Sequence, residues 1–199
     1  MKKRLKWFNK YFKNGTGEFD PQFQVYRDEA HELVFKRAYE LLSITEADVA
    51  EENAIVLMSP EQLDVKSKVR FKVALLDDDD AELIYDQAIL TVLMFGEESL
   101  FYYQANVDYR YGLVTNDLVG ELNYLDIMNV QTSFEYDDLH EPLFEIINVE
   151  LWLYDGTIMP LTLRFRLFNG VMEELILSDK EKLVLNKLHN VIRSKKSLV

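Results

Sequence analysis

The chain has 199 residues, of which 48% are hydrophobic, and this is typical of a globular protein large enough to bury a substantial core. The absence of cysteine excludes disulfide bonds, thiolate metal sites and cysteine nucleophiles. With 35 acidic and 22 basic residues the net charge is −13, which argues against a nucleic-acid-binding surface spread over the whole protein.

Residues 1–13 differ in charge from the rest of the chain. They contain six basic residues and no acidic one, which leaves 16 basic and 35 acidic residues, a net charge of −19, in residues 14–199. Their apolar residues recur at three- and four-residue spacing and predict an amphipathic helix. The Asn14-Gly15-Thr16-Gly17 segment predicts a helix stop at Gly15 and a flexible connector.

The next part of the chain shows helical spacing. Apolar residues from Ala30 to Leu42 predict a helix over residues 26–42. Thr45 followed by Asp48, and Ser59 followed by a proline, predict the starts of two further short helices.

Residues 65–75 alternate between apolar and polar side chains, which predicts a strand; a helix over residues 60–76 is the alternative. The basic residues at the polar positions predict an exposed, positively charged face of this strand. They are Lys66, Lys68, Arg70 and Lys72. Four consecutive acidic residues follow, and Asp80 predicts the cap of a short helix over residues 81–88.

From Ile89 onward the chain has the pattern of a β-rich domain. The predicted strands are residues 89–95, 99–105, 118–124, 126–134, 143–154, 157–168 and 171–177. Asp155-Gly156 is the strongest hairpin signal. Alternation in residues 157–168 predicts that Leu163 and Phe165 are buried and that Arg164 and Arg166 face water.

The chain ends with a predicted helix over residues 178–193. Ser178 and Glu181 form a capping box. The apolar stripe that follows consists of Val184, Leu185, Leu188, Val191 and Ile192.

About seven short strands followed by one amphipathic helix resemble the bacterial pleckstrin-homology-like (PH-like) domains, over residues 89–195. The resemblance implies an antiparallel β-sandwich or partly open barrel closed by the C-terminal helix, and non-catalytic binding of lipids, peptides or proteins. The Gly96-Glu97-Glu98 connection is acidic where phosphoinositide-binding members carry Lys and Arg, so that loop is not expected to recognise a headgroup. We therefore predict an α+β protein with an arm and linker (1–17), a mostly helical region with one possible strand (18–88) and a PH-like domain (89–199).

Catalytic motifs are absent from the sequence. It contains no HExxH pair, no G-x-S-x-G elbow, no Walker loop and no G-x-G-x-x-G turn. His140 lies among carboxylates that could bind a divalent cation, but an exposed loop is the interpretation we favour. We predict no cofactor, no metal and no nucleic-acid partner; a dispersed acidic catalytic site stays open as an alternative.

The N-terminal arm provides the first set of candidate binding residues, for an anionic membrane surface or a partner protein. They are Lys3, Arg4, Lys6, Trp7, Phe8, Lys10, Tyr11 and Phe12. In one hypothesis the aromatic side chains insert at the headgroup boundary while the basic residues contact anionic lipid. In the other, the helix packs on the protein.

Two acidic patches form the second set of candidates, since they would attract a basic protein partner. They are Asp77, Asp78, Asp79, Asp80 and Glu82, and Glu135, Asp137, Asp138 and Glu141. No window approaches the ~20 apolar residues of a membrane span, and no secretory signal is recognisable. We predict a cytoplasmic binding or scaffolding module, with the inner membrane surface as one candidate partner. The alternative is an acidic inhibitor, of the immunity or antitoxin type, of a basic protein.

Overall fold

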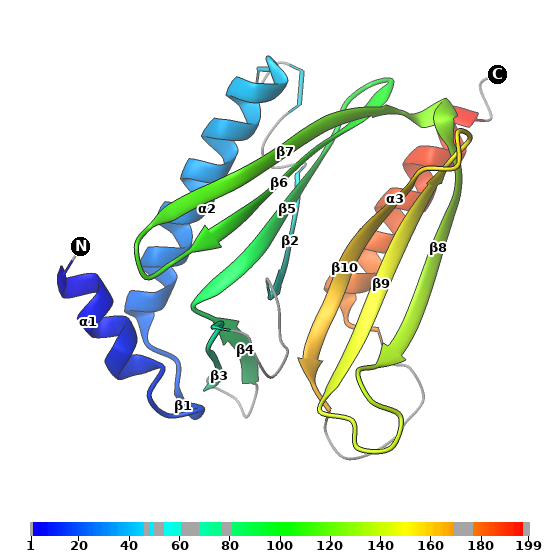
Figure 1. Cartoon of the computed structure of the whole chain (residues 1–199). Coiled ribbons are helices and arrows are strands. Elements are labelled where there is room, and N and C mark those ends of the chain that lie inside the picture. Colours follow the sequence, from blue (N-terminus) through cyan, green and yellow to red (C-terminus); the bar gives the residue numbers. More distant parts are fainter. Residues whose placement is uncertain are drawn as a thin grey trace.

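The computed structural model describes residues 2–45, 48–49, 54–60, 68–76, 81–168 and 177–196. Within these residues the chain forms three α-helices, one short 3-10 helix and ten strands in three sheets (Figure 1). The α+β class is therefore confirmed.

The N-terminal layer consists of α1 (Lys2–Tyr11), β1 (Thr16–Glu18) and α2 (Pro21–Leu42). The helix α2 begins five residues before the predicted start because Asp20 caps it, accepting a 2.9 Å hydrogen bond from the N–H of Gln22, with proline in the first turn. The predicted flexible connector contains a strand, since β1 pairs in parallel with β3.

The central sheet has the order β2-β5-β6-β7 and is covered on both faces. Its strands are β2 (Ile55–Pro60), β5 (Gln87–Phe95), β6 (Ser99–Asp108) and β7 (Leu113–Asn123). On β5, Leu90 and Val92 belong to the core shared with α1 and α2, whereas Leu93 belongs to the core shared with α3. Burial on both faces explains why β5 is a nearly continuous apolar run.

A second layer follows the 3-10 helix η3 (Tyr124–Asp126). The strands β8 (Ile127–Tyr136), β9 (Phe144–Leu153) and β10 (Ile158–Leu167) form a sheet of order β10-β9-β8, and α3 (Asp179–Lys196) packs beside it (Figure 1). The predicted capping box is confirmed: Ser178 N–H donates to Glu181 at 2.7 Å, and Glu181 N–H donates to the Ser178 hydroxyl at 3.3 Å.

The third sheet has the order β1-β3-β4, with β3 (Phe71–Leu75) and β4 (Ala81–Tyr85). The predicted helix over residues 81–88 is therefore wrong, because β4 and the start of β5 occupy these residues. The helix predicted to start at Ser59 is also wrong: Ser59 and Pro60 end β2, an edge strand, where a proline is tolerated.

The basic face predicted for residues 65–75 is exposed only in part: Lys68 is exposed, Arg70 is half-buried, and Lys66 lies outside the described residues. Lys72 is only 4% exposed, and its ammonium group lies 3.4 Å from the carbonyl oxygen of Asn14 and 4.9 Å from the centre of the Tyr11 ring. The connector after α1 covers Lys72, and a carbonyl and an aromatic ring replace part of the hydration that Lys72 loses.

A β-bulge overturns the burial pattern predicted for β10. The register against β9 shifts between Thr162 and Arg164, so Arg164 turns inward and is only 7% exposed. There its guanidinium donates to Glu181 at 2.5 Å and to Glu145 at 3.1 Å. These bonds connect β9, β10 and the first turn of α3.

The predicted division at residue 88 runs through the central sheet, because β2 pairs with β5. The described part of residues 18–88 contains α2 together with β2, β3 and β4, three strands where the prediction allowed one. The described residues form three sheets and no closed barrel. The PH-like arrangement stays a prediction.

Parts of several sequence predictions fall outside the described residues. They are most of the short helix after Thr45, residues 65–67 of the predicted strand 65–75, the acidic run of residues 77–80, and residues 171–176 of the last predicted strand. At the predicted start of the helix after Thr45, Asp48 accepts hydrogen bonds from the N–H of Thr45 at 2.7 Å and from the Thr45 hydroxyl at 2.8 Å.

A bulge in β7 connects the central sheet to α2. The register shifts opposite Ala105, Asn116 adopts a left-handed conformation (φ 57°), and Asp117 accepts hydrogen bonds from Arg37 of α2 and Tyr103 of β6. Burial favours the neutral acid, but these two bonds outweigh it and hold the pKa of Asp117 below its ordinary value of 3.8.

Asp117 is expected to stabilise the fold at neutral pH and to lose this contribution in acid. Because its folded-state pKa is lowered, the unfolded chain takes up a proton first as the pH falls below about 4. Asp117→Asn should therefore flatten the plot of unfolding free energy against pH between about 5 and 2. Urea titrations check this, with the exposed Glu97→Gln as control. Parallel wild-type and Asp117→Asn curves would contradict it.

Candidate functional site

The N-terminal helix α1 has one face in the hydrophobic core. Phe8 is 0% and Phe12 is 5% exposed, and both rings pack against Phe23 of α2 with ring centres 6.3 and 6.0 Å away. The amphipathic helix predicted for the arm is thus present, and its apolar face packs on the protein. In this conformation these two side chains are not available to a membrane.

Trp7 and Tyr11 lie at the border of this core. Their rings stack at 4.6 Å, and the Trp7 indole N–H donates to Asp20 at 3.2 Å. The Tyr11 hydroxyl accepts the N–H of Asp20 at 3.0 Å, and burial raises the pKa of Tyr11. Both aromatic residues therefore hold α1 against the start of α2.

Arg4 is also committed to the fold. Its guanidinium donates to the carbonyl oxygen of Tyr109 and to Glu29, both at 2.6 Å, and lies 4.1 Å from the centre of the Tyr26 ring. Of the eight arm residues predicted to bind a partner, Arg4 and the four aromatic residues thus make intramolecular contacts.

The lysines of the arm are exposed and lie together. They are Lys2, Lys3, Lys6, Lys10 and Lys13. Since each residue of a helix advances by about 100°, the four within α1 fall in an arc of roughly 100°, opposite Phe8. Lys13 follows in the turn after α1. The arm therefore presents a stripe of five lysines to solvent.

The strand β3 and the residues before it extend this stripe. Arg70 donates to the side chain of Asn9 at 3.1 Å, so it lies beside α1, and Lys68 is exposed two residues earlier. Arg70 is also held by Asp86, which is fully buried, at 2.7 Å. We define the basic surface as the five arm lysines with Lys68 and Arg70. The basic alternation in this strand is visible in the sequence, but its position next to α1 is not.

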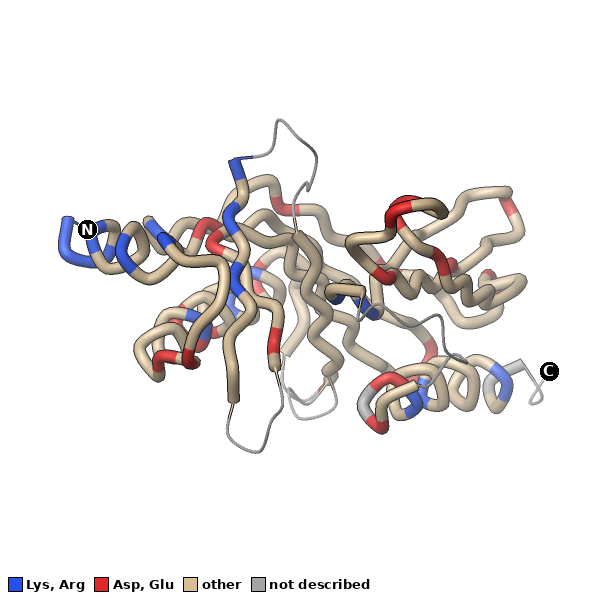
Figure 2. The backbone as a smooth tube through the Cα atoms, turned by 90° about the horizontal axis from the view of Figure 1, so that it is seen from below, with Lys and Arg blue, Asp and Glu red and all other residues tan. Residues whose placement is uncertain are grey.

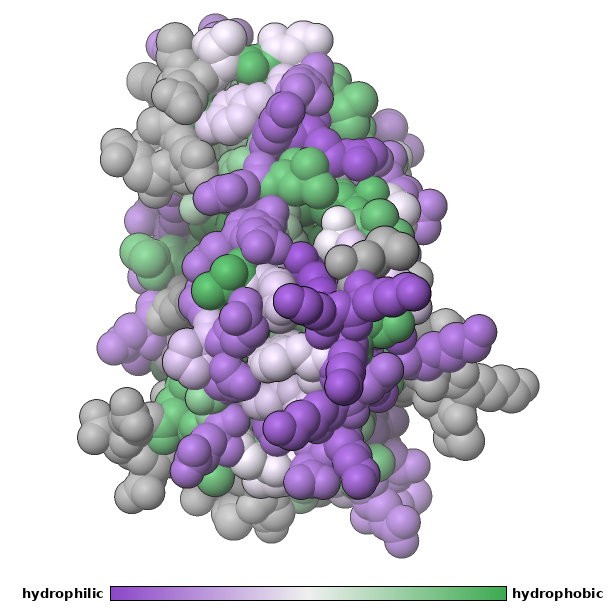
Figure 3. Space-filling model, turned by 90° about the vertical axis from the view of Figure 1, so that its left-hand side faces the viewer, coloured by the Kyte–Doolittle hydropathy of each residue, from purple (hydrophilic) through white to green (hydrophobic). Residues whose placement is uncertain are grey.

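Basic residues are densest on α1 and along β3, as the backbone view from below shows (Figure 2). Further basic residues lie on α2, β10 and α3, and the acidic residues are spread over the elements outside α1. On the side of the molecule with α1 and α2, hydrophilic side chains predominate and hydrophobic ones form separate patches (Figure 3). The basic surface therefore favours contact with an anionic partner over burial of a broad apolar area.

Of the two predicted acidic patches, the structure describes Glu82 of the first and all four residues of the second. Asp77–Asp80 lie outside the described residues, and Glu82 pairs with Arg27 at 2.5 Å. The second patch lies around the β8–β9 loop, away from α1 (Figure 1).

Two carboxylates of this second patch shape the loop itself. Asp137 accepts main-chain N–H groups of Leu143 and Phe144 at 3.0 and 2.7 Å. Asp138 accepts those of Glu141 and His140 at 3.0 and 2.7 Å, and these bonds lower the pKa of Asp138. Asp137 and Asp138, two of the carboxylates near His140 that were considered as cation ligands, thus form hydrogen bonds within the loop.

The described residues contain no group of three or more His, Asp or Glu side chains positioned to hold a metal ion. No helix among them is both long and apolar enough to cross a lipid bilayer. Comparison of the chain with protein-family models, with curated proteins and with solved structures gives no match.

Proposed function

We propose that the protein is a non-catalytic binding module that associates with an anionic membrane surface through its basic surface. The observation that carries this proposal is the stripe of five exposed lysines, four on α1 opposite the buried aromatic residues and Lys13 in the turn after it. Folding alone does not require five like charges on one face, since like charges in neighbouring turns repel each other. An anionic lipid surface offsets this repulsion.

The association is electrostatic and does not need insertion of α1. Each basic residue near an anionic membrane contributes about 1 kcal/mol, so five lysines give appreciable reversible binding. The net charge of −19 in residues 14–199 would repel such a surface. That repulsion is weakened at distances beyond the Debye length of about 10 Å at 0.1 M salt. The protein would therefore approach the membrane with α1 foremost and its acidic bulk pointing away.

Lys6→Gln combined with Lys10→Gln is expected to lower the partition coefficient on anionic vesicles roughly thirtyfold, since two basic residues contribute about 2 kcal/mol. Glutamine has nearly the helix propensity of lysine, so α1 should stay folded. The measurement is co-sedimentation with phosphatidylcholine vesicles with and without phosphatidylserine. The control carries Lys36→Gln and Lys182→Gln, which remove two exposed lysines from α2 and α3 and should bind like wild type.

Two results would contradict the proposal: absence of binding to phosphatidylserine vesicles, or equal binding by the Lys6/Lys10 variant and wild type. Insertion is tested separately by the emission of Trp7 in a Trp152→Phe background, where Trp7 is the only tryptophan left. We expect the emission maximum to stay unchanged on binding. A blue shift would mean that the aromatic face leaves the core and enters the lipid.

A further inference from the structure

The strand β8 has an open edge. It is the last strand of its sheet, and Figure 1 shows it on the outside of the molecule, with β9 on its inner side. Most of its side chains are exposed, including those of Gln131, Thr132 and Ser133. Among the described residues, β8 pairs with no strand other than β9. Its second edge therefore presents main-chain N–H and C=O groups that can pair with a further strand.

The register against β9 identifies the main-chain groups of β8 that point to the open edge. Just after β8, the N–H of Asp137 donates to the carbonyl oxygen of Phe144 at 3.3 Å, so Asp137 directs its main chain toward β9. Main-chain direction alternates along an antiparallel strand, so every second residue before Asp137 also faces β9. The residues between them direct their N–H and C=O groups outward, and they are Val130, Thr132, Phe134 and Tyr136.

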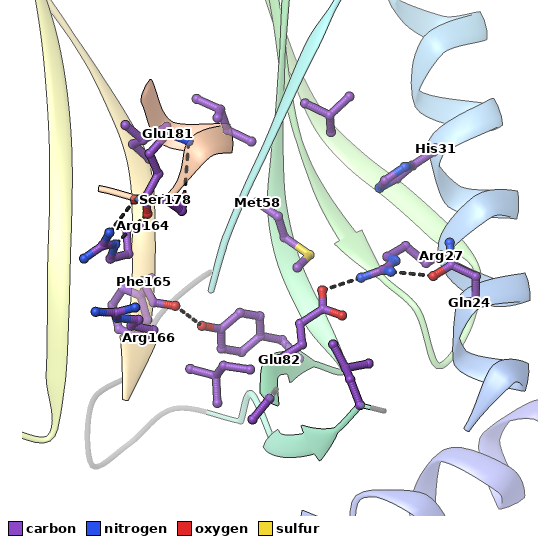
Figure 4. A pocket seen from close by; sticks show the side chains of 17 residues that line it. Gln24, Arg27, His31, Met58, Glu82, Arg164, Phe165, Arg166, Ser178 and Glu181 are labelled. Carbon is purple, nitrogen blue, oxygen red and sulfur yellow. Dashed lines mark hydrogen bonds and ion pairs between the residues drawn. The ribbon is translucent and has the colours of Figure 1, made fainter. Parts of the chain in front are cut away.

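The two edges of this sheet differ in their protection against pairing with another chain. Proline, lysine and bulges commonly protect edge strands. The other edge strand, β10, contains Pro160 and a bulge just before Arg164, and it lines a cavity of about 670 Å³ opposite α2 (Figure 4). β8 contains no proline, lysine or arginine, and its bulge lies before Asn129, outside the outward-facing stretch. Pairing is thus favoured at β8 and disfavoured at β10.

The four outward residues define one two-fold symmetric pairing of β8 with a second copy of itself. In an antiparallel pair, residues that exchange both N–H···O bonds must both direct their main chains toward the partner strand. All four outward residues meet this condition only when Ser133 lies opposite Ser133 of the second copy. Val130 then pairs with Tyr136 of the second copy. Thr132 pairs with Phe134, and the symmetry repeats both pairs, which gives about eight main-chain hydrogen bonds.

One face of this pairing is largely apolar. The rings of Phe134 and Tyr136 are half-buried in one copy and pack together with centres 5.1 Å apart. In the paired strands, Tyr136 lies beside Val130 of the second copy and Phe134 lies beside its Thr132. Opposed aromatic and β-branched side chains stabilise antiparallel strands. Pairing therefore covers apolar surface that a single copy leaves partly in water.

The other face of the pairing is polar and places no like charges opposite each other. Gln131 lies opposite Glu135 of the second copy, so its amide can donate to that carboxylate. One oxygen of Glu135 accepts a hydrogen bond from the Asn148 side chain at 2.5 Å, and the other is available to Gln131. At the centre, the two Ser133 side chains are small enough for the closest approach between the strands. Both faces of β8 are thus complementary to β8 itself.

From this arrangement we infer that two copies of the protein form a symmetric dimer by pairing their β8 strands, which joins two three-stranded sheets into one sheet of six strands. Both ends of the joined sheet are β10 strands, where Pro160 and the bulge disfavour further pairing, so assembly stops at two copies. The inference does not depend on the basic surface, because α1 lies on the opposite side of the molecule from β8 (Figure 1).

The first test measures the mass of the full chain in solution by sedimentation velocity. We expect the mass to rise from that of one chain to that of two as the protein concentration increases to about 100 µM. Because each copy carries a net charge of −13, the salt is kept at about 0.15 M, where the Debye length is about 8 Å. A single-chain mass at every concentration would overturn the inference.

Thr132→Pro should raise the dissociation constant of the dimer about tenfold or more, because it removes two main-chain hydrogen bonds per dimer and none to β9. Thr132→Val keeps the N–H in a strand-forming residue and is the matched control, which should dimerise like wild type. Equal dissociation constants for wild type and Thr132→Pro would contradict pairing through this edge.

Single-cysteine variants test the register, and they give an independent answer should Thr132→Pro fail to fold. The chain contains no cysteine, so each variant has one thiol. In Ser133→Cys the two Cα atoms at this position would lie about 4.5 Å apart across the dimer, within the range of a disulfide. In Gln131→Cys they would lie roughly 14 Å apart, too far for a disulfide. We expect air oxidation to link Ser133→Cys into covalent dimers and to leave Gln131→Cys as single chains. No covalent dimer of Ser133→Cys, or equal linking of both variants, would overturn the inference.

Discussion

Phe8→Ala is expected to lower the free energy of unfolding by about 3–5 kcal/mol, the range for removing a fully buried phenylalanine. The ring of Phe8 has no solvent exposure and contacts the rings of Trp7, Phe12, Phe23 and Tyr26. Alanine leaves a cavity that these rings cannot fill without moving. Urea unfolding followed by far-UV circular dichroism measures the change.

Lys3→Ala is the matched control, because it lies on the exposed face of the same helix. Its effect should stay within about 0.5 kcal/mol, as for surface positions in general. A small effect of Phe8→Ala would mean that α1 is a detachable arm in solution. It would also reopen the hypothesis that the aromatic face inserts into a membrane. Deletion of residues 1–13 is a poor test of membrane binding, because it removes Phe8 and Phe12 from the core and so disturbs the fold.

Arg164→Met is expected to destabilise the protein by about 3–5 kcal/mol, because removal of one partner from a buried ion pair leaves a buried charge without compensation. Methionine keeps an apolar side chain of similar length but cannot donate to Glu181 or Glu145. In the wild type, burial favours the neutral acid, yet the bonds from Arg164 and Ser178 outweigh this and lower the pKa of Glu181. Thermal and urea unfolding measure the loss.

Two comparisons separate the charge effect from packing. Adding Glu181→Gln to Arg164→Met should recover part of the loss, because the unpaired carboxylate is removed. Arg166→Gln should cost less than about 1 kcal/mol, since the Arg166 side chain is 52% exposed. Equal losses in the Arg164 and Arg166 variants would contradict the buried network. In wild type, Glu181 stabilises the fold above its ordinary pKa, and this contribution is lost as the pH falls through the lowered value.

Local sequence signals predicted the elements whose stability arises from nearby residues. The capping box at Ser178 and Glu181 predicted α3, and Asp155-Gly156 predicted the β9–β10 hairpin. In the structure, Gly156 has φ +87°, the conformation that such a turn requires of glycine. The start of α2 was also readable, since Asp20-Pro21 is a capping signal that the prediction of residues 26–42 overlooked.

The errors fall where distant contacts override a local pattern. Alternation predicted that Arg164 faces water, but a bulge whose position depends on pairing with β9 turns it inward. Lys72 has the pattern of a solvated lysine, yet the connector after α1 covers it. Residues 81–85 become a strand because they pair with β3.

For the candidate sites too, adjacent residues determine some features and contacts between distant residues determine the others. Composition and helical spacing showed that residues 1–13 form a basic amphipathic helix, because charge and periodicity are properties of adjacent residues. Which side chains of that helix are available to a partner depends on packing against α2 and the central sheet, which buries Phe8 and Phe12 and leaves five lysines exposed. The placement of Arg70 beside Asn9 brings together residues far apart in the chain. Such contacts form only when the whole chain buries its apolar surface, so tertiary structure alone specifies them.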